Sequence, residues 1–253
     1  MLSALWNSKS GMQAMQDKMD SISNNIANVS TNGYKKVDMG FSDLLSETFG
    51  RNGYPTNVNN GNTPYTGTGV KSDEWIMDNK QGDLNETDVD TDLAIDGKGY
   101  FAVTLSDGTT AYSRAGDFSL DAKGQLVDGN GNRLKIDYTG NATSLEKDNF
   151  KVTEDGKIYT KDGNKNIGKI SLYNVVGDDS PVPIGDNLYS FKSGSQVYKV
   201  SNSSIKQGFT EMSNVDIGTE MTDLIVAQRA FQLNSKGLQT ADEMMSMINN
   251  MKK

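Results

Sequence analysis

The sequence contains neither cysteine nor histidine among its 253 residues. Without cysteine, no disulfide bond and no cysteine-based zinc site can form. The two missing residues also supply much of the nucleophilic and proton-transfer chemistry that enzymes perform near neutral pH. Carboxylates, lysine, tyrosine or serine could still catalyse a reaction, but no pair of acidic residues is marked out by its setting. We therefore expect no cofactor, no metal ion and no enzymatic activity.

The sequence also lacks a surplus of positive charge and any long apolar run. Its formal net charge is -8 and its pI is about 4.7, which argues against nucleic acid and anionic membrane surfaces as partners. No apolar stretch approaches the ~20 residues of a membrane span. Residues 1–10 lack the basic and apolar regions of a secretory signal. Composition alone thus predicts a cytoplasmic chain without membrane insertion.

Residues 1–36 are expected to form a long helix followed by a turn. Apolar residues recur every seven positions, and a second column lies three residues further on, interrupted only by Ser8. The two columns are Leu5, Met12, Met19, Ile26 and Ser8, Met15, Ile22, Val29. At ~1.5 Å per residue the helix would be about 40 Å long. Asn32-Gly33 then offers a left-handed stop.

The middle of the chain divides into two zones of different composition. Residues 37–69 are expected to form a linker or an extended contact arm, because Asn, Gly and Thr dominate residues 50–69 without helical or strand periodicity. Residues 70–210 predict many short strands. Turn dipeptides separate alternating apolar segments such as residues 100–105. They are Asp96-Gly97, Asp107-Gly108, Asp128-Gly129, Asn130-Gly131, Asp155-Gly156 and Asp162-Gly163.

Residues 211–253 predict a second long helix. One column is fully apolar and the other is mixed, with two small alanines that permit close approach of a partner helix. The columns are Ile217, Leu224, Phe231, Leu238, Met245 and Glu220, Ala227, Asn234, Ala241, Ile248. The predicted fold class is therefore mixed α and β. Long N- and C-terminal helices form a coiled-coil core, and the central domain is an antiparallel β-rich sandwich or partly closed barrel.

Two amphipathic helices that bracket one β domain need something to cover their apolar stripes. They could simply pair within one chain. They could also pack on neighbouring copies in a polymer, where the flexible methionines on both stripes would adapt to different neighbours. The expected subunit-interface residues are the apolar heptad positions of both helices. They are Leu5, Met12, Met15, Met19, Ile22, Ile26, Val29, Leu224, Phe231, Leu238, Met245 and Ile248.

Several stretches resemble the motifs of flagellar rod and hook proteins. Residues 23–35 read SNNIANVSTNGYK, and residues 93–101 read LAIDGKGYF. Residues 111–118 read AYSRAGDF, followed by GQLV at 124–127. The expected signature turn comprises Asn24, Asn25, Ala27, Asn28, Thr31, Gly33, Tyr34 and Lys35. The C-terminal signature comprises Ser213, Asn214, Val215, Gln228, Arg229, Asn234, Ser235 and Lys236.

The resemblance implies a structural subunit of the bacterial flagellar rod, a hollow shaft that transmits torque from motor to hook. The chain's length and its first six residues most resemble a distal rod subunit, with a proximal rod or hook-type subunit as the alternative. The implied partners are further copies, other axial proteins and the type III export apparatus. The implied location is the flagellar basal body, reached without a cleaved signal peptide.

Individual signature residues can be assigned hypothetical roles. Asn24, Asn25 and Asn28 would hydrogen-bond backbone groups where the first helix ends. They would either merely cap that helix or make direct contact with another subunit. Gly33 would take a positive φ, with Tyr34 packed on the helix pair and Lys35 at its rim.

Two other functions fit the sequence less well. Residues 88–92 alternate acidic residues as calcium loops do, but Leu93 and Gly99 stand where an EF-hand needs Gly and Glu. A β-rich surface adhesin or binding module is the rival function, yet such a module would not require heptad helices at both ends.

Overall fold

A computed structural model describes residues 2–44, 46–48, 65–139, 145, 149–161, 166–175, 181–191, 194–200 and 202–251. The chain forms two compact units. Unit 1 combines residues 1–27, 37–76 and 216–253, and unit 2 combines residues 28–36 and 77–215. Each unit therefore contains residues from both halves of the sequence. Most of the expected arm, residues 50–64, lies outside the described residues.

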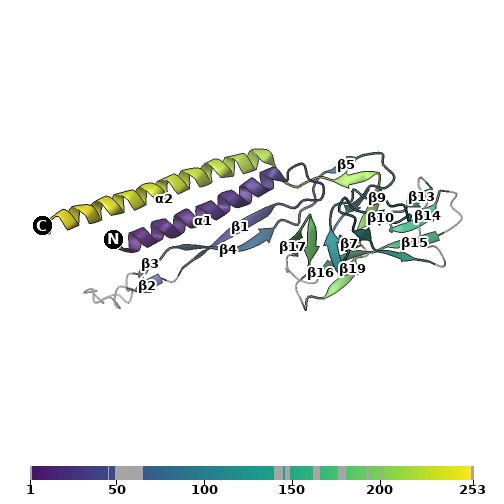
Figure 1. Ribbon diagram of the computed structural model, residues 1–253, viewed down its shortest axis with the longest axis horizontal. Coiled ribbons are helices and arrows are strands. Elements are labelled where there is room, and N and C mark those ends of the chain that lie inside the picture. The colour runs from purple at the N-terminus through teal and green to yellow at the C-terminus, as the bar shows by residue number, and fades with distance from the viewer. Residues whose placement is uncertain are drawn as a thin grey trace. The chain divides into compact units, whose positions relative to one another are not determined.

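Unit 1 is built on two long helices that lie side by side, α1 (Leu2–Ala27) and α2 (Ile217–Met251) (Figure 1). Asp216 caps α2, because its carboxylate accepts hydrogen bonds from the Gly218 backbone N–H at 3.1 Å and the Thr219 hydroxyl at 2.7 Å. The helices run antiparallel: Asn25 contacts Glu220 near one end, and Gly11 faces Asn234 fourteen residues away on both helices.

Small residues bring the two helices close together. Ala14, Ala227 and Ala241 are buried in unit 1. A Cβ atom added at Gly11 would lie 2.8 Å from Asn234 Nδ2, and one added at Gly237 would lie 3.1 Å from Ser8 Oγ. The helix–helix contact is thus set by small and polar residues as much as by the large apolar columns.

A pair of strands packs along α1 within unit 1. Strand β1 (Val37–Asp43) pairs with β4 (Val70–Met77), and β2 (Ser46–Thr48) pairs with β3 (Tyr65–Gly67). Ser21 Oγ donates a 2.7 Å hydrogen bond to the Val37 carbonyl, and Lys18 pairs with Asp38. The segment expected as a linker therefore contains strands. A signal for β1 was available, since Val37, Met39 and Phe41 alternate, but the Asn-, Gly- and Thr-rich composition of residues 50–69 outweighed it.

Unit 2 consists of short strands, and all of its strand pairs within the described residues are antiparallel. Its first strands are β5 (Leu84–Glu86), β6 (Leu93–Asp96), β7 (Tyr100–Thr104), β8 (Thr110–Ser113), β9 (Ser119–Leu120), β10 (Leu126–Val127), β11 (Arg133–Leu134) and β12 (Ile136–Tyr138). The others are β13 (Phe150–Val152), β14 (Lys157–Thr160), β15 (Asn166–Ile170), β16 (Leu172–Val175), β17 (Val182–Gly185), β18 (Leu188–Ser190), β19 (Val197–Val200), β20 (Ser204–Gln207) and β21 (Phe209–Glu211).

These strands form four sheets. The largest follows the order β17-β18-β8-β7-β11-β10-β9, with β16 joined to β7 and β19. A second follows the order β12-β15-β14-β13, and β6 and β5 pair with β20 and β21. Four of the predicted turn dipeptides are confirmed. Asp107-Gly108 joins β7 to β8, and Asp155-Gly156 joins β13 to β14. Asp128-Gly129 and Asn130-Gly131 form the turn between β10 and β11. Asp162-Gly163 lies outside the described residues.

One apolar core holds unit 2 together. It collects side chains from both larger sheets and from β6 and β20, with Phe101 and Phe118 packed edge to face at 5.5 Å between ring centroids. The mixed α and β class, with a helix at either end and an antiparallel β-rich centre, is confirmed. No helix in the described part of the chain is long and apolar enough to span a membrane.

The close helix contact in unit 1 yields a first prediction. Replacing the buried Ala227 with Leu adds three carbon atoms where α1 has no room, so we expect unit 1 to lose about 1–3 kcal/mol of stability. Gln228→Leu adds an apolar side chain at the exposed neighbouring position and should change stability by less than about 0.5 kcal/mol. Urea unfolding followed by circular dichroism at 222 nm reports on both helices. Equal unfolding midpoints would contradict the packing described here.

Candidate functional site

The second part of the N-terminal signature, residues 28–35, forms a compact turn in unit 2. The Thr31 backbone N–H bonds the Asn28 carbonyl at 3.1 Å, and that of Tyr34 bonds the Thr31 carbonyl at 3.3 Å. Gly33 has a φ of 68°, the left-handed conformation expected from the sequence, and its N–H donates to the Glu211 carbonyl at 2.7 Å. A Cβ at this position would lie 2.4 Å from the backbone nitrogen of Ala115. Only glycine fits both the conformation and the space.

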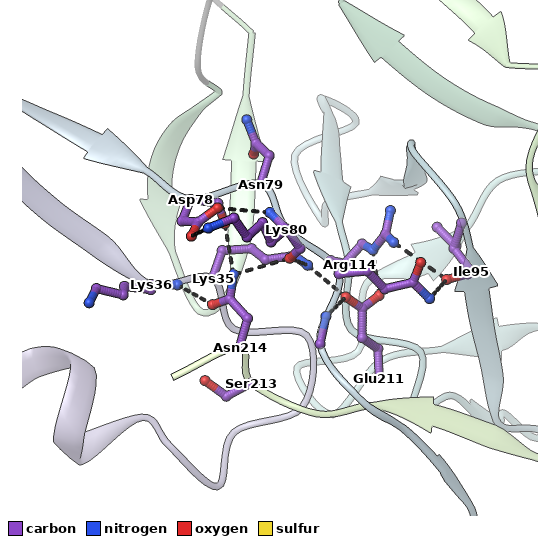
Figure 2. A network of polar contacts seen from close by, with 12 residues as sticks. Lys35, Lys36, Asp78, Asn79, Lys80, Ile95, Arg114, Glu211, Ser213 and Asn214 are labelled. Carbon is purple, nitrogen blue, oxygen red and sulfur yellow. Dashed lines mark hydrogen bonds and ion pairs between the residues drawn. The ribbon is translucent and has the colours of Figure 1, made fainter. Parts of the chain in front are cut away.

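The carboxylate of Glu211 lies at the centre of a buried ion network in unit 2 (Figure 2). Its Oε1 accepts hydrogen bonds from Lys35 Nζ at 2.6 Å and from the Gly82 backbone N–H at 3.0 Å. Its Oε2 accepts one from Arg114 Nε at 2.5 Å. All three charged side chains are at most 5% exposed. One acidic group thus joins the signature turn, strand β21 and the segment after β8.

The remaining N–H groups of Arg114 donate hydrogen bonds to backbone carbonyls. Its two terminal nitrogens donate to the carbonyls of Gly99 and Gly97, the latter at 2.6 Å. These carbonyls belong to the LAIDGKGYF stretch that resembles a rod-protein motif. The guanidinium therefore fixes the loop between β6 and β7 with a planar set of donors that lysine could not reproduce.

Burial also shifts proton affinities at this network. Desolvation lowers the pKa of Lys35, although the nearby Glu211 carboxylate acts in the opposite direction. Desolvation raises the pKa of Tyr100 to about 12, and the phenol donates a 3.0 Å hydrogen bond to Asn79. The expectation that Lys35 lies at a rim is wrong, because the side chain is only 2% exposed and inside the fold. The sequence did not predict the burial of Lys35, because its partner Glu211 lies 176 residues away.

Asn214 extends the same network towards the end of unit 2. Its amide Oδ1 accepts a 2.7 Å hydrogen bond from the Lys36 backbone N–H. Its Nδ2 donates to the carbonyls of Asp78 at 2.9 Å and Lys80 at 3.1 Å (Figure 2). Lys35 Nζ donates to the same Lys80 carbonyl at 2.6 Å, so the end of the N-terminal signature and the start of the C-terminal signature converge on one backbone group in unit 2.

In unit 1, Asn25 makes a comparable connection. Its Nδ2 donates to the Val37 carbonyl at 3.0 Å and to Glu220 Oε2 at 3.1 Å, while its Oδ1 accepts from the Val37 N–H at 3.0 Å. Asn25 and Glu220 are each 1% exposed. This asparagine ties α1 both to β1 and to the first turn of α2. Asn24 and Ala27, by contrast, lie on the exposed side of α1.

The predicted subunit-interface residues are partly covered within one chain. Of the twelve, Ile22 is buried at 2% and Ile248 is exposed at 48%. The other ten are half-buried, namely Leu5, Met12, Met15, Met19, Ile26, Val29, Leu224, Phe231, Leu238 and Met245. The C-terminal signature is divided: Ser213, Asn214 and Val215 belong to unit 2, whereas Gln228, Arg229, Asn234, Ser235 and Lys236 lie on α2.

Sequence reasoning missed the most exposed apolar residues of α2. Val226 is 62% exposed, Leu233 68%, Met247 59% and Met251 87%. Val226, Leu233 and Met247 occupy one heptad column, with Thr240 as its remaining member, so a signal was available. This column was overlooked because the two predicted columns of α2 show a stronger heptad pattern. We call Val226, Leu233, Met244, Met247 and Met251 the outer stripe of α2.

The residues arranged here offer no evident chemistry. Across the described ranges, no group of three or more acidic residues is placed to hold a metal ion. The carboxylate of the central network is fully engaged by Lys35, Arg114 and the Gly82 N–H. What the geometry provides is a set of fixed connections between distant segments and an uncovered helix surface.

Comparison with known proteins identifies these segments. Residues 5–35 match the family described as flagella basal body rod protein, residues 94–160 the flagellar hook protein FlgE/F/G D1 domain, and residues 206–251 the flagellar basal body rod FlgEFG protein C-terminal family. The chain is therefore built as an axial protein of the flagellum, with its motifs in the expected order.

Curated relatives match along the whole chain. The flagellar basal-body rod protein FlgG of Borreliella burgdorferi is 35% identical and that of Bacillus subtilis 37% identical, each over 100% of both chains. The corresponding protein of Agrobacterium fabrum is 37% identical over 97% of both chains. The chain belongs to the family of flagellar basal-body rod proteins.

The signature turn generates a second prediction. Gly33→Ala should destabilise unit 2 by about 3 kcal/mol or more, because its Cβ would overlap the backbone of Ala115 in addition to the strained φ. Gly131→Ala is the matched control, since Gly131 has a φ of 82° but no atom within 4 Å of the added Cβ. We expect that variant to lose only about 1 kcal/mol. Calorimetric melting of both proteins would measure the difference, and similar losses would refute the close approach.

Proposed function

We propose that this chain is a structural subunit of the bacterial flagellar rod, of the distal type, and that it polymerises through its terminal helices. Membership of the rod family supports the first part. The identity of its relatives, which are basal-body rod proteins FlgG, favours the distal type over a proximal or hook-type subunit. The matched families are families of structural proteins, so membership gives no support to an enzymatic role.

The outer stripe of α2 is the observation that carries the assembly hypothesis. Its five residues are between 47% and 87% exposed, while Asn234 and Gly237, on a neighbouring face of the helix, lie against α1. Covering one large apolar side chain is worth roughly 1.5–3 kcal/mol. Exposed large apolar side chains that share one helix face are typical of an interaction surface. Its natural cover, in a family of polymerising subunits, is another copy of the chain.

The arrangement of covered and uncovered helix faces favours an open assembly. One side of α2 is taken by α1 of the same chain, and we propose that the outer stripe contacts a different surface of the neighbouring copy. Such a head-to-tail contact between unlike surfaces generates a helical filament when it does not close into a ring. Three of its five residues are methionines, whose flexible side chains can fit neighbours in slightly different positions.

Heptad spacing on both helices supports coiled-coil packing in that polymer. The helices would form the wall of a hollow shaft that transmits torque from motor to hook, and the shaft would contact other axial proteins at its ends. The buried ion network of unit 2 would help each subunit resist deformation under load. We further propose a basal-body location, reached through the type III export apparatus without a cleaved signal peptide.

The assembly hypothesis makes a third prediction. The double variant Val226→Glu, Leu233→Glu places two charges on the outer stripe and should abolish polymerisation while leaving the fold intact, because both side chains are more than 60% exposed. Sedimentation and negative-stain microscopy would detect polymers, and swimming assays in cells that lack their own subunit would report function. Gln239→Glu, at an exposed polar position of α2, is the control and should assemble normally.

Two results would count against the hypothesis. If the double variant polymerised and restored swimming as well as the control, the outer stripe could not be a subunit interface. If the unaltered protein formed no polymer at high concentration and cells without it built complete flagella, the rod function itself would be wrong.

A further inference from the structure

The last strands of unit 2, residues 204–214, connect to several segments that are distant in the sequence. Backbone hydrogen bonds link Ile205 to Glu154, Gly208 to Thr87 and Asp92, and Met212 to Asp83. Side-chain bonds of Gln207, Glu211 and Asn214 add contacts to the signature turn, to Arg114 and to β13. We call residues 204–214 the closing segment.

Two strands depend on the closing segment for their pairing. Within the described residues, β6 pairs in its sheet only with β20, and β5 pairs only with β21. Yet Leu93, Ala94 and Ile95 of β6 are all 0% exposed. Without β20, the buried backbone of β6 would lose hydrogen-bond partners, which costs about 1–3 kcal/mol for each group left unsatisfied.

The closing segment also completes the apolar core. Ile205 is 2% exposed and belongs to the cluster that contains Phe101, Phe150 and Ile158. Gln207 bonds the Val152 N–H at 2.9 Å and the Asp90 carbonyl at 2.7 Å. Removing these residues would open the core and leave β13 without part of its cover.

Unit 2 depends on the closing segment also for charge balance, because Glu211 supplies the negative charge of the buried ion network. Lys35 and Arg114 are both buried, and Glu211 is the carboxylate that accepts hydrogen bonds from both. Until Glu211 arrives, closing the unit would place two cations in a water-poor interior without their counter-charge. Breaking a buried ion pair from one side is strongly destabilising.

We propose that the closing segment is a conformational latch. Unit 2 stays open until residues 204–214 dock, and the ion pairs of Glu211 with Lys35 and Arg114 make that docking specific. A chain delivered from its N-terminal end would therefore remain unfolded through its first 200 residues and close only when its last fifth arrives. This property concerns folding and holds whether or not the chain polymerises.

The test cuts the full-length chain once and follows its reassembly. A protease site inserted after Asn202, in an exposed bend, would yield fragments 1–202 and 203–253. The fragments are separated in urea, returned to buffer and mixed. Hydrogen exchange is measured at the amides of β7 and β8, which bond to each other inside the first fragment. We expect no protection in fragment 1–202 alone and full protection after fragment 203–253 is added.

Two variants distinguish the contribution of the Glu211 ion pairs from that of strand pairing alone. Glu211→Gln keeps the shape of the side chain, removes its charge and should weaken reassembly on the order of 100-fold. Asp96→Asn breaks the exposed 2.8 Å ion pair with Lys206 across the same β6–β20 pair and should weaken it less than about 5-fold. Protected β7 and β8 amides in the separated fragment 1–202 would overturn the latch. Equal affinities of the two variants would overturn the role of the charges.

Discussion

One buried carboxylate organises unit 2. Glu211 accepts hydrogen bonds from Lys35, Arg114 and the Gly82 backbone, and its own carbonyl accepts the Gly33 N–H. A buried charge of this kind is costly unless its partners are in place. The three charged residues come from the signature turn, the segment after β8 and the last strand. Their burial together therefore fixes the meeting point of three distant segments far more strictly than apolar contact alone could do.

In unit 1 a buried but uncharged side chain, that of Asn25, likewise joins distant segments. Asn25 bonds both the backbone of β1 and the side chain of Glu220, so α1, the strand pair and α2 meet at one buried polar cluster. Beyond it, glycine and alanine let the helices approach each other closely. Each unit thus joins the two ends of the sequence. In unit 1 the proposed assembly surface, the outer stripe of α2, does not include this polar cluster.

The sequence was sufficient to predict the helices, the β-rich centre and several turns, because heptad spacing and Gly-containing dipeptides are local signals. It was also sufficient to mark the signature segments through their resemblance to rod proteins. The sequence could not reveal that Lys35 is buried, because its partner Glu211 lies 176 residues away and no local pattern links the two residues. Strand β1 was missed, although its apolar residues alternate, because it was grouped with the Asn-, Gly- and Thr-rich residues that follow it. The outer stripe was hidden behind two stronger apolar columns.

The central claim is that Lys35 and Glu211 stabilise unit 2 as a pair. A double-mutant cycle with Lys35→Met and Glu211→Leu, measured by urea unfolding of unit 2, tests this most directly. We predict that either single change costs about 3 kcal/mol or more, and that the double variant is more stable than the sum of the two losses by at least about 2 kcal/mol. Additive losses within about 0.5 kcal/mol would show that the two residues act independently, and the account would fail.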